Sequence, residues 1–166
     1  MLRLKVYGLS TISEQNAVII ALVPEDDDSG EEILSIWVTP QTAQLVLMAL
    51  HDEISERPMM VDLFLKSLEE LHALIVRCEI YGLVDQIYYA RLVVRCEDGS
   101  DFSLEARPSD VIILALRTKV PLEIDDELFH AKKFTSEERR DSLEDEMASF
   151  RKFLDQVNPE DFREGT

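Results

Sequence analysis

A short motif occurs twice in this chain, as KVYGL at residues 5–9 and as EIYGL at residues 79–83. Each copy leads through an apolar stretch, a polar turn and a second alternating stretch to a proline, which is Pro40 or Pro108. Such stretches are typical of strands, and proline suits the first position of a helix. Two β-β-β-α units packed together bury faces that neither could bury alone. The repeat therefore predicts an α+β fold, in which a duplicated β-β-β-α unit forms a mixed, mostly antiparallel sheet flanked by helices.

Local patterns predict where the elements lie. The expected strands are 17–23, 33–38, 74–81, 88–94 and 102–106. A helix between the two units is expected to open at Arg57-Pro58, because apolar residues follow this pair with helical 4-3-4 spacing. Residues 120–124 form a short strand in this interpretation. Pro121 places it at an edge of the sheet, since proline has no N–H for a ladder hydrogen bond.

Length and composition predict one main domain with an appendage. We expect an α+β domain at 1–130, with its repeat halves at about 2–56 and 74–124, and a C-terminal helical tail at 131–166. The 46% of hydrophobic residues can fill a core. No apolar run approaches the roughly 20 residues of a membrane helix, and the first residues do not resemble a signal peptide. The sequence therefore predicts a cytoplasmic protein that does not contact membranes.

The tail carries its own helix signals. Thr135 and Glu138 are spaced as a capping box, and Asn158-Pro159 would end the helix. Between them, one apolar stripe has 4-3-4-3 spacing: Leu143, Met147, Phe150, Leu154 and Val157. Two heptads are too few for a free-standing coiled coil. We therefore expect the stripe to dock on the domain or on a neighbouring subunit, and we predict a homo-oligomer.

The charge of the chain restricts its partners. A formal net charge of −17 and a pI near 4.4 describe a surface that repels phosphate backbones. Nucleic acid is thus disfavoured as a partner unless a local basic groove or divalent cations offset the field. The two cysteines, Cys78 and Cys96, lack metal-ligand spacing and indicate neither a disulfide framework nor a zinc site.

Polar residues cluster where the second unit passes from strand to helix. Ser109 and Asp110 fall in the first turn after Pro108, next to Arg107. Acids in that position can simply cap the helix, with a gain of about 0.3–1 kcal/mol. The alternative is a functional site, in which Arg57 and Arg107 recognise phosphate rather than hold helices together through carboxylate forks. The sequence leaves both interpretations open.

Four segments of the sequence resemble the bifunctional nuclease domain family. They are RPMMVDL at 57–63, YYA at 88–90, ARPSDVIILALRT at 106–118 and FRKFLDQVNPEDF at 150–162. The resemblance extends over almost the whole chain, and the Arg-Pro-Ser-Asp block is its most specific part. It implies an α+β fold with a duplicated β-α unit, nuclease activity on DNA and RNA, and frequent self-association.

The sequence departs from the family's pattern at two positions. Val61 stands where the family usually has a histidine, and Thr42 where it usually has a glutamate. In the repeat, Thr42 matches Asp110, so the acid is present in one half only. Valine can neither titrate nor coordinate a metal. Both departures weaken the expectation of catalysis, since phosphodiester hydrolysis commonly uses metals held by carboxylates.

Two hypotheses from different classes follow. In the first, the chain is a metal-assisted nuclease, with Asp110, Asp62 and Ser109 as catalytic residues and Arg57 and Arg107 as substrate-binding residues. The acids Asp110, Asp62 and Glu105 would then hold a divalent Mg²⁺ or Mn²⁺ ion. In the second, the chain is a catalytically impaired relative that acts as an interaction or regulatory module through self-association and protein partners. The first hypothesis requires the polar helix starts to face one shared hollow.

Overall fold

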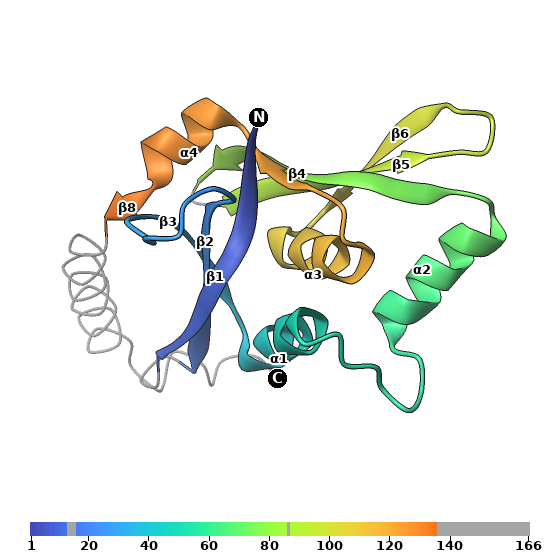
Figure 1. Cartoon of the computed structure of the whole chain (residues 1–166), viewed down its shortest axis with the longest axis horizontal. Coiled ribbons are helices and arrows are strands. Elements are labelled where there is room, and N and C mark those ends of the chain that lie inside the picture. Colours follow the sequence, from blue (N-terminus) through green and yellow to red (C-terminus); the bar gives the residue numbers. More distant parts are fainter. Residues whose placement is uncertain (13–15, 86, 136–166) are drawn as a thin grey trace, which may run out of the picture.

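The computed structural model describes residues 1–12, 16–85 and 87–135. Its strands form one sheet in the order β6-β5-β4-β7-β1-β2-β3-β8 (Figure 1). The first part of the chain contributes β1 (Leu2–Ile12), β2 (Ala17–Pro24), β3 (Glu32–Val38) and α1 (Pro40–Leu50). After α2 (Met60–Glu70) come β4 (Leu74–Val84), β5 (Ile87–Arg95), β6 (Asp101–Ala106) and α3 (Pro108–Thr118). The last described elements are β7 (Leu122–Ile124), α4 (Asp126–Lys132) and β8 (Phe134–Thr135).

This arrangement confirms the predicted α+β class. The order strand, strand, strand, helix occurs twice, and the neighbouring pairs β1–β2, β2–β3, β4–β5 and β5–β6 are antiparallel. The parallel pairing of β4 with β7 makes the sheet mixed. That the two halves arose by duplication stays a prediction, and the expected tail helix lies outside the described residues.

The short strand β7 joins the two halves of the sheet. It pairs in antiparallel fashion with β1 and in parallel with β4, so it lies inside the sheet. The prediction that this strand would form an edge was wrong. The reason is that Pro121 precedes the paired residues Leu122–Ile124, and its carbonyl accepts a hydrogen bond from the amide of Cys78 at 2.9 Å. The missing N–H of the proline therefore interrupts no ladder.

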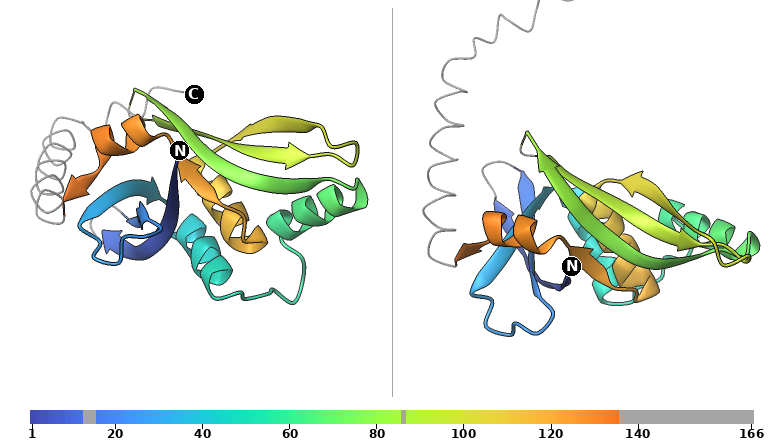
Figure 2. Two further views of the ribbon diagram at one scale, coloured as in Figure 1. Left: turned by 45° about the horizontal axis from the view of Figure 1, so that its top comes forward. Right: turned by 90° about the horizontal axis from the view of Figure 1, so that it is seen from above.

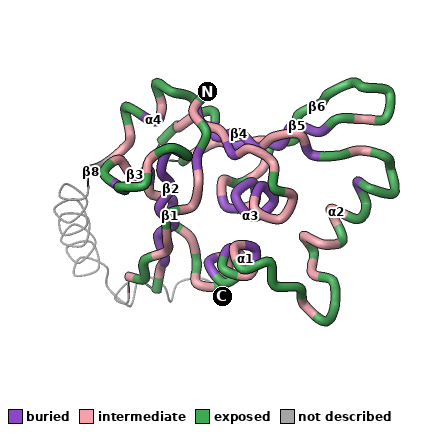
Figure 3. Tube along the Cα trace, viewed as in Figure 1, coloured by how far each residue is buried: buried purple, intermediate pink, exposed green. Residues whose placement is uncertain are grey.

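Helices α1 and α3 pack against each other in the angle between the β1–β3 strands and the β4–β6 strands (Figure 2). Their contact and the adjoining strand faces form the main core, which includes Val46 of α1, Ile112 of α3 and Leu22 of β2. Buried positions concentrate in β2, β4 and α3, whereas α2 is mostly exposed and buries only Leu68 (Figure 3). The closing helices of the two halves thus meet at the centre of the molecule.

Helix α2 begins two residues after Pro58 rather than at it. Met59 is the N-cap residue, and the carboxylate of Asp62 accepts a hydrogen bond from the Met59 amide at 2.9 Å. This reciprocal cap fixes the helix start at Met60 and corrects the expectation that Arg57-Pro58 opens the helix. None of the helices in the described residues is long and apolar enough to span a bilayer.

Candidate functional site

The first turns of α1 and α3 open onto one cavity of about 640 Å³. Both halves of the chain contribute the start of a strand and the start of the closing helix, and the first half also contributes the end of β3. The described residues that line it are Asn16, Ala17, Ser35, Ile36, Trp37, Val38, Thr39, Thr42, Ile87, Tyr88, Arg107, Pro108 and Ser109. This cavity is not the hollow predicted between the starts of α2 and α3, because α1 provides its second helix start and no residue of α2 lines it.

The sequence at 106–110 positions the α3 side of the cavity. Arg107 is the N-cap residue with extended backbone (φ −69°, ψ 149°), and Pro108 takes the first helical position, as predicted. No side chain of the described residues caps this helix start. Ser109 lines the cavity and is only 8% exposed. The unpaired N–H groups and the helix dipole make such a start favourable for an anion.

Arg107 and Asp110 form a two-point ion pair at the mouth of the cavity. Nε of Arg107 lies 2.7 Å from one carboxylate oxygen of Asp110, and a terminal nitrogen lies 2.9 Å from the other. The hydrogen bond and the charge of Asp110 raise the pKa of the guanidinium. The Arg107 side chain is 75% exposed, so solvent reaches the pair. An exposed pair of this kind contributes at most about 1 kcal/mol, which allows an incoming anion to compete for Arg107.

The α1 side of the cavity presents two hydroxyl groups. Thr39 is the N-cap of α1, and its Oγ1 accepts a hydrogen bond from the Thr42 amide at 3.3 Å. The two threonine hydroxyl oxygens lie 3.1 Å apart. Hydroxyl groups can donate to a bound anion without adding charge. This half of the site is thus neutral and polar, and the α3 half supplies the charge.

Two aromatic residues complete the wall. Trp37, the single tryptophan of the chain, is 40% exposed at the end of β3, and Tyr88 is half-buried at the start of β5. Burial raises the pKa of the Tyr88 hydroxyl, which therefore stays protonated at neutral pH. Aromatic side chains in a mostly apolar lining suit the stacking of nucleic-acid bases, which is worth about 1–3 kcal/mol per base.

The charge of the cavity differs from that of the chain. Of the described residues that line it, Arg107 alone carries a charge at neutral pH. The chain as a whole has a formal net charge of −17. An anion inside the cavity therefore meets one guanidinium and two helix starts, and it meets no carboxylate from the lining.

The other predicted site residues lie elsewhere. Asp62 caps α2 and pairs with Arg117 in the last turn of α3, about 10 Å along the helix axis from Asp110 in the first turn. Arg57 is exposed in the segment before α2, and Glu105 is exposed on β6. The structure therefore unites Arg107, Ser109 and Asp110 but separates them from Asp62 and Arg57.

The distance between Asp62 and Asp110 bears on the predicted metal site, because both acids were expected to hold the ion. Among the described residues, no three histidine, cysteine, aspartate or glutamate side chains gather closely enough to hold an ion. The trio Asp110, Asp62 and Glu105 does not come together, since Asp110 lies in the first turn of α3 whereas Asp62, on α2, pairs with Arg117 in the last turn of α3. The donor set thus does not fit a metal held by protein ligands alone.

Among the lining residues not predicted as site residues, four have polar or aromatic side chains that matter for binding: Trp37, Thr39, Thr42 and Tyr88. A signal for two of them was present, because the repeat aligns Thr39 to Thr42 with Arg107 to Asp110. Treating both helix starts of the repeat as one site would have identified the threonines. Tyr88 belongs to the YYA segment that carries the family resemblance, but neither Tyr88 nor Trp37 was assigned to the site, since both enter the cavity through the packing of the two halves.

The fold and the cavity define an α+β protein whose two closing helices begin at a common hollow with a mostly apolar lining and one guanidinium. Comparison with known proteins gives the family: the bifunctional nuclease domain matches residues 22–137, and the chain belongs to this family. An uncharacterized protein of Mycobacterium tuberculosis H37Rv is 26% identical over 165 residues, which is 96% of each chain. Bifunctional nuclease 1 of Oryza sativa subsp. japonica is 27% identical over 106 residues. That match covers 63% of this chain and 32% of the rice protein.

Proposed function

We propose that this chain is a nuclease that binds a phosphodiester of DNA or RNA in the cavity between the starts of α1 and α3. Membership of the bifunctional nuclease domain family and the name of the rice relative support the reaction class. The observation that carries the location is the cavity itself. Its lining combines two helix starts and one arginine, without a carboxylate, in a strongly acidic chain.

In this proposal, Arg107 exchanges one anion for another. A planar guanidinium binds phosphate oxygens through the same two-point geometry that now holds Asp110. Ser109 and Thr42 donate hydroxyl hydrogen bonds to the phosphate, and Trp37 and Tyr88 stack with the flanking bases. The helix starts stabilise the negative charge that develops on the phosphate oxygens.

Asp110 changes its role when Arg107 turns to the phosphate. Its carboxylate, released from the ion pair, becomes the acid group nearest to the bound phosphodiester. It can then accept a proton from an attacking water or, in RNA, from a ribose hydroxyl. The attacking oxygen bonds to phosphorus, the P–O bond to the leaving nucleotide breaks, and the leaving oxygen takes a proton from solvent. Asp62 is a positioning residue in this scheme, because it holds the other end of α3 through Arg117. No step is assigned to a protein-bound metal, since the described donor set does not fit one.

Binding and cleavage are tested separately with the full chain. Trp37 is the single tryptophan, so quenching of its fluorescence reports directly on nucleotides in the cavity. We expect a short single-stranded oligonucleotide to quench this fluorescence. Arg107→Gln should weaken its binding by about 10- to 100-fold, as expected for the loss of a charge-assisted contact of about 1.5–3 kcal/mol.

A matched control is available in the same chain. Arg95 makes the same two-point contact with Asp101, at 2.8 and 2.9 Å, and it does not line the cavity. Arg95→Gln should leave oligonucleotide binding unchanged. Equal losses in the Arg95 and Arg107 variants would assign binding to general charge and refute the location.

Cleavage is measured with labelled single-stranded DNA, duplex DNA and RNA, each with Mg²⁺, with Mn²⁺ and with a chelator. We expect Asp110→Asn to retain binding and to lose most of the turnover. Equal cleavage rates for wild type and Asp110→Asn, with protein repurified to constant specific activity, would remove Asp110 from the mechanism. Failure of the wild type to cleave any substrate would refute the nuclease proposal.

A second candidate function is favoured by the lack of a metal-binding set among the described residues. The absence of a metal-binding trio among the described residues, together with Thr42 and Val61, fits a family member that binds nucleic acid or a partner without cleaving it. Under this alternative, oligonucleotides quench Trp37 and Arg107→Gln weakens binding, but no divalent ion supports turnover. The paired binding and cleavage measurements distinguish the two functions.

A further inference from the structure

Strand β6 forms one edge of the sheet, and no strand of the described residues pairs with its outer side (Figure 1). All residues of β6 from Asp101 to Glu105 are exposed. The strand pairs with β5 without a register shift, and it contains neither lysine nor proline. Bulges, lysine and proline are common protections of a free edge. Because β6 has none of them, its outer side is open to pairing with another strand.

The ladder between β5 and β6 determines which backbone groups point outward. The hairpin closes where the amide of Cys96 donates to the carbonyl of Ser100 at 2.8 Å. Hydrogen-bonded and non-hydrogen-bonded pairs alternate along an antiparallel ladder. The even-numbered residues of β6 therefore bond to β5, and Asp101, Ser103 and Glu105 direct their N–H and C=O groups away from the sheet.

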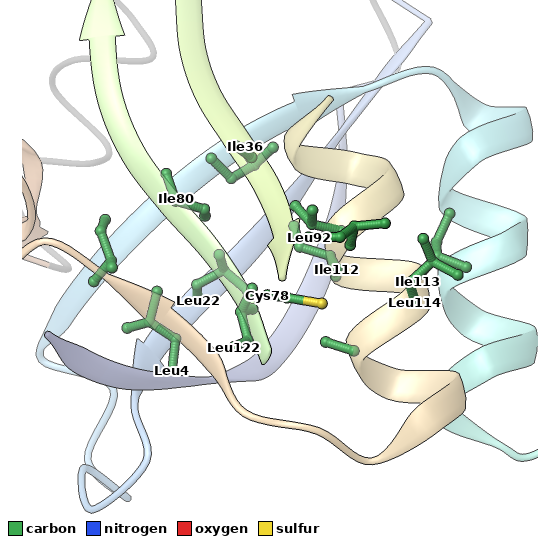
Figure 4. Close-up of a cluster of buried hydrophobic side chains, with 14 of the residues drawn as sticks. Leu4, Leu22, Ile36, Cys78, Ile80, Leu92, Ile112, Ile113, Leu114 and Leu122 are labelled. Carbon is green, nitrogen blue, oxygen red and sulfur yellow. The ribbon is translucent and has the colours of Figure 1, made fainter. Parts of the chain in front are cut away.

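The core-facing side of β6 is apolar and partly uncovered. Phe102 lies opposite Val94 of β5, and Leu104 lies opposite Leu92. Val94 and Leu92 are buried, and Figure 4 draws Leu92 within the main cluster near α3. Phe102 and Leu104 are 40% and 38% exposed. The apolar face of the sheet thus continues to its edge, where both side chains present accessible surface.

We propose that two copies of this chain pair through β6 in an antiparallel ladder centred on Leu104. In this register, Leu104 lies opposite Leu104 of the partner subunit, and the large Phe102 lies opposite the small Ala106 of the partner subunit. The outward backbone groups of Ser103 bond to those of Glu105 of the partner subunit. The two sheets then form one continuous sheet, and the exposed apolar side chains of the two edges cover each other.

Charge selects this register over its neighbours. A ladder centred on Ser103 would place Asp101 opposite Glu105, and a ladder centred on Glu105 would place two copies of that acid opposite each other. Like charges directly opposite are destabilising. In the proposed register, Asp101 lies opposite Arg107 of the partner subunit, whose extended backbone (φ −69°, ψ 149°) continues the strand. The edge is therefore complementary to itself, which identifies a second copy as its partner.

A proline substitution tests the ladder in the full chain. The contact of one strand pair is at the low end of interface sizes, so we expect a micromolar dimer in sedimentation equilibrium. Ser103→Pro removes an outward N–H and leaves the ladder to β5 intact. It should weaken dimerisation by at least about tenfold, because each copy loses a backbone hydrogen bond, without changing the far-UV circular dichroism spectrum. The matched control Ser103→Ala keeps the N–H and should dimerise like the wild type.

Cysteine substitutions test the register. They are made in a Cys96→Ser background, in which the remaining Cys78 is buried. Opposite residues of a non-hydrogen-bonded pair have Cα atoms about 4.5 Å apart, which allows a disulfide. Leu104→Cys should therefore form a disulfide-linked dimer on mild oxidation. Phe102→Cys should not, because its two copies would lie about 13 Å apart, but it should cross-link when mixed with Ala106→Cys.

The proposal holds whether or not the chain cleaves nucleic acid, and it does not involve the C-terminal segment. A chain that stays monomeric throughout the micromolar range would leave β6 to a strand of another protein and would overturn it. A dimer that Ser103→Pro does not weaken would assign self-association to another surface. Cross-linking of Phe102→Cys alone as fast as Leu104→Cys would refute the register.

Discussion

Glu79 offers a direct test of how the centre of the sheet is stabilised. Its carboxylate lies on β4 between β5 and β7, and the residue is 3% exposed. Nε of Arg77 approaches one carboxylate oxygen at 2.5 Å, and Nε of Arg91 approaches the other at 2.5 Å. Arg91 also lies over the ring of Tyr81, 4.9 Å from its centroid. One buried acid is thus held by two arginines that are themselves partly solvated.

The predicted perturbation is Glu79→Gln. The amide keeps the shape of the side chain but loses the charge and can accept only at one oxygen. A hydrogen bond to a charged group is worth about 1.5–3 kcal/mol, whereas breaking a fully buried ion pair costs about 3–5 kcal/mol. Because Arg77 and Arg91 are 40% and 42% exposed, solvent limits the loss to the lower range. We expect the free energy of unfolding to fall by about 2–3 kcal/mol, with a fall in Tm of roughly 4–12 °C.

The effect of the substitution should depend on pH. Burial opposes ionisation of Glu79, but the hydrogen bonds from Arg77 and Arg91 outweigh it and lower the pKa of the carboxyl. A lowered folded-state pKa contributes stability that is complete above the unfolded value and is lost as pH falls through the folded value. The stability difference between wild type and Glu79→Gln should therefore be full at about pH 7 and should shrink below about pH 4.

The assay is urea denaturation followed by far-UV circular dichroism at pH 7 and pH 3. Asp101→Asn is the matched control, since its partner Arg95 is exposed and the pair should contribute no more than about 1 kcal/mol. The reasoning is refuted if Glu79→Gln destabilises no more than Asp101→Asn at pH 7. It is also refuted if the Glu79→Gln difference is the same at both pH values.

Three further outcomes follow from single residues. Gly30 has φ +68°, and a Cβ there would lie 2.7 Å from the Tyr7 ring, so Gly30→Ala should lower the free energy of unfolding by about 1–3 kcal/mol in urea titrations. Burial, reinforced by the charge of a neighbouring acid, raises the pKa of the Cys78 thiol to about 12. A disulfide reagent at pH 8 should therefore modify only the partly exposed Cys96 in native protein and both thiols in urea. Asp62→Asn should lower stability by about 1–3 kcal/mol, because the amide loses the charge that pairs with the mostly buried Arg117, and it should leave quenching by oligonucleotides unchanged.

The sequence was sufficient to predict those elements whose position depends on neighbouring residues alone. Pro40 and Pro108 both occupy the first turn of a helix, as the repeat predicts, because a fixed φ and a missing N–H are favourable only there. Strands β2 and β5 follow the predicted apolar stretches because core-facing strands need apolar side chains, whereas β6 has no buried residue and its alternating pattern predicted the strand but not its exposure. These signals need no knowledge of the remaining chain.

Features that depend on distant contacts could not be predicted in this way. The strand Leu122–Ile124 has only three residues, and its place inside the sheet comes from pairing with β1 and β4. Helix α4 is short and was not predicted, although Asp125 caps it by accepting a hydrogen bond from the Leu128 amide at 3.0 Å. The cavity could not be predicted from local patterns either, because its two helix starts come from opposite halves of the sequence and meet only when the halves pack.

The two departures from the family's pattern have unequal consequences. Val61 lies on α2, packed against the core and away from the cavity, so the histidine it replaces would not reach the phosphate proposed to bind between α1 and α3. Thr42 lines that cavity. A glutamate there would place a carboxylate at the start of α1, facing the same hollow as Arg107, and would offer a ligand to a cation while repelling a phosphate. Threonine removes that carboxylate, so under the proposed function residue 42, rather than residue 61, is the position at which we expect a substitution to change the preference between cation and anion.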